Sequence, residues 1–180
     1  MPSSTPAPRP AQDIRPAEIP RHLDIVRGLF RDYADSLGVS LDFQDFEAEL
    51  AGLPGDYAPP RGRLLIAWQA DEPVGCVALR PLEQGICEMK RLYVKPEGRA
   101  TGLGRGLAHR ICDEARAAGY ERMRLDTLST LTAARQLYEA LGFRVIPPYY
   151  FNPIPGVIYL ELELARRAPQ DPASKTTRVP

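Results

Sequence analysis

The segment KPEGRATGLGRGL, residues 95–107, brings four glycines together where a strand-like run ends and a helical pattern begins. The first N–H groups of a helix have no intrahelical partner, and with the positive end of the helix dipole they attract anions. Glycine lets an anion approach the backbone because it has no side chain. The segment therefore predicts a turn that binds a phosphate or pyrophosphate group. A glycine-rich turn that only permits close packing is the alternative.

Two common phosphate-binding motifs do not fit this segment. A dinucleotide fingerprint that starts at Gly102 requires glycine or alanine at position 107, where the chain has Leu107. A fingerprint that starts at Gly104 reaches His109 instead. The chain also has no GxxxxGKS or GxxxxGKT run, so a different phosphate-binding loop must account for the glycines.

Outward from this segment, the sequence predicts helices and strands around one sheet. Apolar residues at helical spacing predict helices at 20–37, 42–50 and 102–118, and a fourth that is capped by Ser129 or Thr130 and ends before Gly142. Strand-like runs lie at 63–70, 73–82, 86–94, 123–128, 143–145 and 157–164, with a short strand near 12–16. After that short strand the predicted order is ααβββαβαββ, and the first three strands of the run form antiparallel hairpins.

The composition is that of a single globular domain. The chain has 180 residues, of which 44% are hydrophobic and 26% are charged. We expect one domain at 13–165 between proline-bearing tails at 1–12 and 166–180, because these tails carry too little apolar surface to become ordered.

Charge and cysteine content exclude several kinds of partner. Lys plus Arg and Asp plus Glu both number 23, so the chain is no general polyanion binder and we expect no nucleic-acid partner. Three cysteines without a CxxC pair, and only two histidines, argue against a disulfide framework and against a metal site. No apolar run is long enough for a signal peptide or a membrane span, so we expect a cytoplasmic protein with no membrane partner.

The pattern Arg99-x-x-Gly102-x-Gly104, after an antiparallel strand and at the start of a helix, resembles the GNAT superfamily of acetyl-CoA-dependent N-acetyltransferases. The resemblance extends over about 20–164 and is densest from CEMKRLYV (87–94) through this loop to LYEALGF (137–143). It implies an α+β fold with a central, mostly antiparallel, twisted sheet flanked by about four helices. In this fold, splayed central strands hold coenzyme A.

The resemblance also implies where the cosubstrate acetyl-CoA binds, without a metal. Its pyrophosphate would lie on backbone amides of the glycine-rich loop, and its pantetheine arm along the strand before it. The implied residues are Leu92, Tyr93, Val94, Arg99, Ala100, Thr101, Gly102, Leu103, Gly104 and Arg105. Charge agrees with this interpretation, because 88–124 contains nine Lys or Arg and only five Asp or Glu.

Amide formation requires an acid and a base. A primary ammonium ion has a pKa of about 10.4, so a proton must leave before or during attack on the thioester. Glu88 stands where several GNAT enzymes have a basic glutamate; the alternative is that it pairs with Lys90 or another cation across the sheet. Asp126 is the substitute candidate for the base.

Tyr138 occupies the family position of the general acid that protonates the departing thiolate. The alternative is an amphipathic core tyrosine. Seven residues earlier many family members have an asparagine that contacts coenzyme A, and this chain has Leu131. Cys87 can also be considered as an acyl-transfer nucleophile, but a small buried strand residue is the better interpretation.

The segment PPYYFNPIPG, residues 147–156, presents aromatic and amide side chains on a loop stiffened by prolines. In GNAT-like folds this region borders the acceptor pocket, so Tyr149, Tyr150 and Asn152 are candidate acceptor-binding residues, together with Tyr33 from the first helix. A rigid loop packed for stability and a homodimer contact are the alternatives.

Taken together, these patterns predict an N-acetyltransferase that transfers acetyl from acetyl-CoA to the primary amine of a small molecule, by direct attack in a ternary complex. The alternatives are a peptide or protein N-acetyltransferase and a non-catalytic, CoA-binding regulatory module.

Overall fold

The structure is a computed structural model that describes residues 12–164. Seven strands form one sheet in the order β1-β2-β3-β4-β5-β7-β6. The strands are β1 (Asp13–Pro16), β2 (Arg63–Gln69), β3 (Glu72–Glu83), β4 (Ile86–Val94), β5 (Arg122–Leu128), β6 (Arg144–Ile146) and β7 (Val157–Glu163). All neighbours are antiparallel except β4 and β5, which are parallel. The predicted α+β fold is therefore confirmed.

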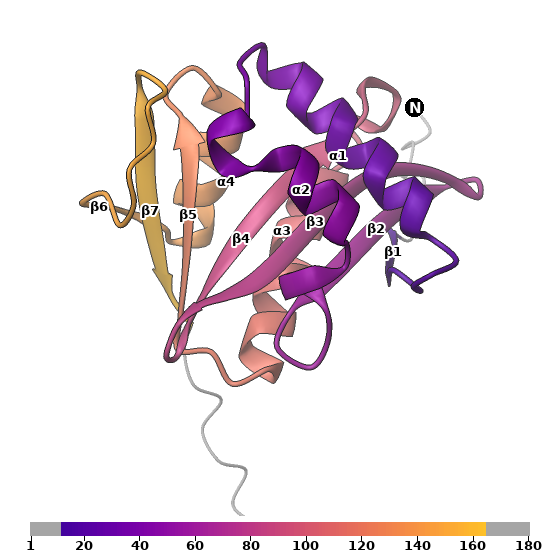
Figure 1. The fold of residues 1–180 in the computed structure, drawn as a ribbon, viewed down its shortest axis with the longest axis horizontal. Coiled ribbons are helices and arrows are strands. Elements are labelled where there is room, and N and C mark those ends of the chain that lie inside the picture. The colour runs from indigo at the N-terminus through magenta and orange to yellow at the C-terminus, as the bar shows by residue number, and fades with distance from the viewer. Residues whose placement is uncertain (1–11, 165–180) are drawn as a thin grey trace, which may run out of the picture.

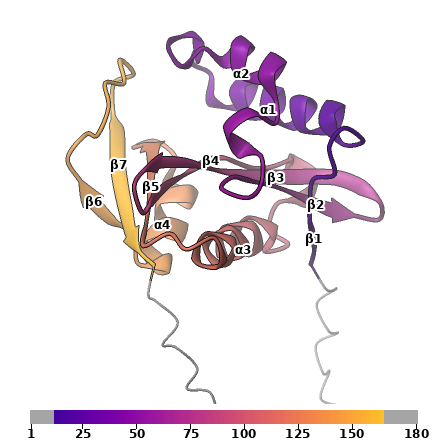
Figure 2. The ribbon, with the colours of Figure 1, turned by 60° about the horizontal axis from the view of Figure 1, so that its bottom comes forward.

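Helices cover both faces of the sheet, as Figure 2 shows. One face carries α1 (Leu23–Leu37) and α2 (Phe46–Gly52), and the other carries α3 (Leu103–Ala117) and α4 (Thr132–Leu141). Three short 3-10 turns, η1 (Asp42–Gln44), η2 (Gly55–Tyr57) and η3 (Pro96–Gly98), lie between these elements. Each face of the sheet buries a separate apolar cluster, one against α1 and α2 and the other against α3 and α4. Such burial contributes about 25 cal/mol per Å² of apolar surface removed from water.

Two predicted helices differ from the structure at their starts. The helix predicted over 42–50 is interrupted because Asp45 adopts a left-handed conformation, with φ 51°, between η1 and α2. The predicted cap of the fourth helix at Ser129 or Thr130 is wrong, because Leu131 occupies the N-cap and no side chain caps the helix. The tails predicted at 1–12 and 166–180 lie outside the described residues, apart from Gln12.

The sheet opens between its two central strands. Residues of β4 and β5 pair only over Ile86–Glu88 and Arg122–Arg124, and beyond these pairs the strands run apart (Figure 1). A bulge in β4 accompanies this opening, because two β4 residues stand opposite one β3 residue between the pairs Cys76↔Tyr93 and Ala78↔Lys90. Arg91 lies within the bulge and has a φ of 59°. The fold thus creates an opening between β4 and β5 in the middle of the sheet.

Candidate active site

A cleft lies where β4 and β5 separate, bounded also by α1, α4 and the segments 39–44 and 152–154. The structure brings several predicted site residues to this cleft from distant parts of the chain. Those that line it are Tyr33, Leu92, Asp126, Tyr138 and Asn152. Glu88, Tyr149 and Tyr150 are not among its lining residues, but they belong to the polar network beside it.

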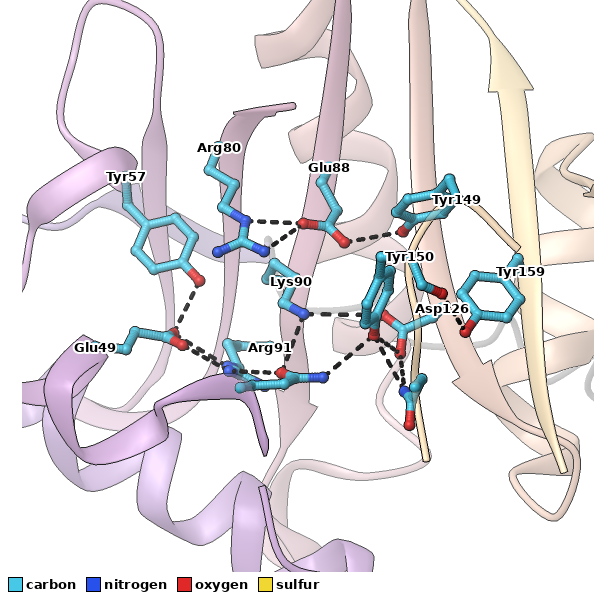
Figure 3. A network of polar contacts seen from close by, with 12 residues as sticks. Glu49, Tyr57, Arg80, Glu88, Lys90, Arg91, Asp126, Tyr149, Tyr150 and Tyr159 are labelled. Atoms are coloured by element: carbon cyan, nitrogen blue, oxygen red, sulfur yellow. Dashed lines mark hydrogen bonds and ion pairs between the residues drawn. The ribbon is translucent and has the colours of Figure 1, made fainter. Parts of the chain in front are cut away.

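Glu88 is buried, with 1% of its surface exposed, and both of its carboxylate oxygens have protein partners (Figure 3). Arg80 stands opposite it in the β3–β4 register and donates from Nε to Glu88 Oε2 at 2.8 Å. The Tyr149 hydroxyl donates to Oε1 at 2.9 Å. The cation that pairs with Glu88 is thus Arg80 rather than Lys90. The role of Glu88 as a base stays a prediction.

Asp126 and Lys90 face each other across the opening, one on each strand. Lys90 Nζ lies 3.8 Å from Asp126 Oδ1, and their side chains are 5% and 13% exposed. The other oxygen, Oδ2, accepts hydrogen bonds from the Tyr150 hydroxyl at 2.7 Å and from Asn152 Nδ2 at 3.1 Å. Burial lowers the pKa of Lys90, although the nearby carboxylates of Glu88 and Asp126 act in the opposite direction.

A buried clamp connects α2 to the bulge of β4, and sequence reasoning did not find it. Glu49 accepts two hydrogen bonds from the Arg91 guanidinium, at 3.1 and 2.6 Å, and a third from the Tyr57 hydroxyl at 2.8 Å. The guanidinium also lies over the rings of Phe46 and Tyr33, at 5.2 and 5.6 Å from their centroids. This arrangement fixes the bulge that faces the cleft. The charged pair Lys90-Arg91 within an apolar strand run was the available signal.

The loop 147–156 closes over one side of the cleft. Tyr149, Tyr150 and Tyr159 pack as an aromatic cluster with centroids 5.4–5.6 Å apart. The Tyr159 hydroxyl donates to the Tyr150 carbonyl at 3.0 Å, which connects the loop to β7. Hydrogen bonds from Tyr149, Tyr150 and Asn152 then reach Glu88 and Asp126 on the sheet. This loop therefore borders the cleft and is anchored by the carboxylates beside it.

Tyr138 reaches the cleft from α4. Its ring meets Phe143 edge to face at a centroid distance of 5.6 Å, and only 7% of the residue is exposed. Burial raises the pKa of its hydroxyl above the ordinary value, so the hydroxyl is protonated at neutral pH. Within residues 12–164, no protein group accepts a hydrogen bond from this hydroxyl. Tyr138 therefore has a proton that it can donate into the cleft.

The glycine-rich turn follows β4 and starts α3, as the sequence predicts. Gly102 is the N-cap residue of α3 with a φ of 87°, a conformation that side chains disfavour. The first backbone bond of the helix runs from Gly106 N to Gly102 O, so within the described chain the N–H groups of 103–105 have no backbone acceptor. These groups fit a pyrophosphate chemically. Close packing explains Gly98 instead, because a Cβ there would lie 3.0 Å from Val94 Cγ1.

The described residues contain neither a candidate metal site nor a helix that could span a membrane. Across residues 12–164, no group of three or more His, Cys, Asp or Glu side chains could hold a metal ion. In the same part of the chain, no helix has the length and apolar character needed to cross a bilayer.

The chain belongs to the acetyltransferase (GNAT) family, whose model matches residues 26–143. An uncharacterized N-acetyltransferase of Schizosaccharomyces pombe is 43% identical over 157 residues, covering 85% of this chain and 95% of the relative. The N-acetylaspartate synthetase of Danio rerio is 29% identical over 73% of this chain and 48% of its own length. The protein is thus an acetyl-CoA-dependent N-acetyltransferase, as the sequence predicted.

Solved structures agree with this fold. An acetyltransferase from Streptococcus agalactiae superposes with a TM-score of 0.71 at 24% identity, covering 85% of this chain and 98% of the other. A putative acetyltransferase of Salmonella typhimurium, solved with acetyl-CoA, superposes with a TM-score of 0.62 at 22% identity, covering 91% and 99%.

Proposed function

We propose that this protein acetylates the primary amine of a small molecule, by direct attack of the amine on acetyl-CoA in a ternary complex. The observation that carries the proposal is that one cleft is lined both by a carboxylate, Asp126, and by a buried tyrosine hydroxyl, that of Tyr138. A transfer between amine and thioester needs both a proton acceptor and a proton donor at the same place.

In this proposal acetyl-CoA is held by the glycine-rich turn and the end of β4. The N–H groups at 103–105 would bind its pyrophosphate, and Leu92, Tyr93 and Val94 would lie along its pantetheine arm. When bound, acetyl-CoA supplies the acetyl group as a thioester. The φ of Gly102 and the open N–H groups of the turn support this assignment.

Asp126 receives the proton of the attacking amine in this proposal, and Tyr138 gives a proton to the departing sulfur. The new C–N bond forms as the C–S bond breaks. The nitrogen then loses its second proton, which replaces the one that Tyr138 gave to the sulfur, so the proton held by Asp126 is the one released to solvent. Asp126 Oδ1 suits this role because its hydrogen-bond donors, Tyr150 and Asn152, both bind Oδ2. Glu88 remains the other candidate base, although Arg80 and Tyr149 already engage its two oxygens.

The loop that closes one side of the cleft favours a small acceptor. The loop 147–156 is anchored at several points, and a peptide would have to displace these contacts to pass through. The N-acetylaspartate synthetase among the relatives, whose name refers to an acetylated amino acid, also favours a small acceptor. We therefore prefer a small molecule to a peptide or protein.

The proposal is tested by release of free thiol from acetyl-CoA across a panel of polyamines, amino acids, aminoglycosides and N-terminal peptides, with each product identified by mass. Acetylation of a free small amine at least tenfold faster than of any peptide supports the proposal. Faster acetylation of peptides would overturn the choice of acceptor. Coenzyme A binding without release of thiol for any amine would indicate a non-catalytic module.

A further inference from the structure

The ion pair that has both of its residues in the lining of the cleft is a loose one. Three pairs close to hydrogen-bond distance: Arg80–Glu88 at 2.8 Å, Arg91–Glu49 at 2.6 Å and Arg124–Glu161 at 2.7 Å. The fourth, Lys90–Asp126, has its charged atoms 3.8 Å apart, and both of its residues line the cleft. Figure 3 shows these two side chains reaching toward each other from neighbouring strands.

Each partner of this loose pair keeps unused hydrogen-bonding capacity. The Lys90 ammonium has three N–H donors, and Nζ makes one hydrogen bond within the described residues, to Gln44 Oε1 at 3.2 Å. Asp126 Oδ1 accepts no hydrogen bond there, since Tyr150 and Asn152 both donate to Oδ2. Because the Lys90 side chain is 95% buried, free donors at this position favour a ligand that can accept them.

We infer that the acceptor is an α-amino acid, which deepens the proposed function and rests on it. Its carboxylate would accept hydrogen bonds from the two free N–H groups of Lys90, and its amino group would donate a hydrogen bond to Asp126 Oδ1. One carbon atom joins these two groups in an α-amino acid. The carboxylate can therefore face Lys90 while the ammonium group faces Asp126. A zwitterion adds no net charge to the buried site, whereas a simple ammonium ion adds a positive charge beside the cations Lys90 and Arg91.

The remaining lining suggests which side chain such an acceptor carries. Leu37, Val39, Leu41 and Ile154 present an apolar wall to the same cleft, from the end of α1, the segment after it and the loop 147–156. A carbon side chain would be removed from water against this wall, which favours binding. The acceptor is therefore an apolar α-amino acid, for which leucine is the probe.

The test compares leucine with two analogues that retain its side chain and amine. Isopentylamine lacks the carboxylate, and leucinamide has a neutral amide in its place. We expect kcat/KM for leucine to exceed that for isopentylamine by about 10- to 100-fold, because a hydrogen bond to a charged group contributes about 1.5–3 kcal/mol. Leucinamide should resemble isopentylamine. Equal values for all three would overturn the inference and leave the proposed function intact.

A variant locates the effect at the loose pair. Lys90→Met should lower the ratio of kcat/KM for leucine to kcat/KM for isopentylamine toward one, because the loss of the cation beside Asp126 affects both amines alike and cancels in the ratio. Arg116→Met is the control, because it removes a cation from the last turn of α3, where Arg116 pairs with Asp113. An unchanged preference for leucine in Lys90→Met would overturn the inference.

Binding separates this inference from the proposed function. Titration of leucine into the protein saturated with coenzyme A requires no turnover. Heat of binding for leucine but not for isopentylamine supports the inference even if no amine is acetylated, an outcome that would overturn only the proposed function. Absence of leucine binding at millimolar concentration would overturn the inference.

Discussion

Asp126→Asn removes the proposed proton acceptor with little change in shape. The asparagine oxygen can still accept hydrogen bonds from Tyr150 and Asn152 at the position of Oδ2, so the loop 147–156 keeps its anchor. The amide nitrogen then occupies the position of Oδ1, 3.8 Å from Lys90 Nζ, and cannot accept a proton from an amine. The substitution therefore affects proton transfer more than folding.

The expected loss follows from the ionisation of the amine. An alkyl amine with a pKa of about 10.4 is free base in roughly one molecule in 2,500 at pH 7. Without a base, the reaction depends on this fraction, and a positioned base typically contributes about 10² to 10⁴ in rate. A stability loss of about 1–3 kcal/mol from an altered buried hydrogen bond can accompany it. Thermal unfolding of both proteins separates the two effects.

The assay is the pH profile of turnover at saturating acetyl-CoA. The variant should be slowest relative to the parent at neutral pH, and its rate should rise about tenfold per pH unit toward the pKa of the amine. Glu88→Gln is the matched comparison, since it removes a carboxylate beside the cleft that Arg80 and Tyr149 already engage. Parallel profiles for Asp126→Asn and the parent would show that Asp126 is not the base. A pH-dependent loss in Glu88→Gln alone would identify Glu88 as the base.

Three further substitutions test the rest of the site. Tyr138→Phe should keep coenzyme A binding and lower turnover by about 10² to 10⁴, because it removes only the hydroxyl whose proton the thiolate receives. Gly102→Glu should weaken coenzyme A binding, measured by calorimetry, by about tenfold or more, since it adds bulk and like charge to the anion-binding turn. Burial alone would raise the pKa of Glu49, but the hydrogen bonds and charge of Arg91 outweigh it and lower that pKa. The resulting stability is present above the ordinary glutamate pKa of about 4.3 and is lost as the pH falls through the lowered value. In urea unfolding, Glu49→Gln should lose about 3 kcal/mol at neutral pH and show a weaker acid dependence than the parent.

Each of these substitutions has a control elsewhere in the chain. Tyr120→Phe removes a hydroxyl that donates to the Arg61 carbonyl, and neither residue lines the cleft, so turnover should be retained. Gly119→Glu imposes a side chain on a glycine with φ 86° after α3, where a Cβ has no neighbour within 4 Å. For Glu49→Gln the control is Glu47→Gln, which removes an exposed carboxylate that pairs with Arg31. Equal effects in a substitution and its control would assign the loss to general destabilisation.

The local backbone structure near the candidate site could be predicted from the sequence. The glycine-rich turn after β4 requires only a strand end, a positive φ at Gly102 and a helix start, all of which nearby residues determine. The Arg80–Glu88 pair could also be predicted from the sequence, because a turn centred on Gln84 puts these two residues opposite each other. We considered a cation across the sheet without identifying it.

The parts that depend on tertiary contacts were not predictable from sequence patterns. The clamp joins Glu49 to Arg91 across 42 positions of sequence, and neither residue has a local feature that identifies the other. The loose pair of Lys90 and Asp126 depends on where the parallel pairing of β4 and β5 ends, which strand propensity does not determine. For the same reason Asp126 was only the second candidate for the base.

In the proposed reaction the acetyl group passes directly from acetyl-CoA to a small amine at the cleft between β4 and β5. The most direct test follows acetyl-CoA labelled in its acetyl group through a single turnover, with mass analysis of both the protein and the amine. Direct transfer predicts no label on the protein when the amine is absent, and one label on the amine nitrogen for each thiol released when the amine is present. Label on the protein before the amine is added, for example on Cys87, would contradict direct transfer.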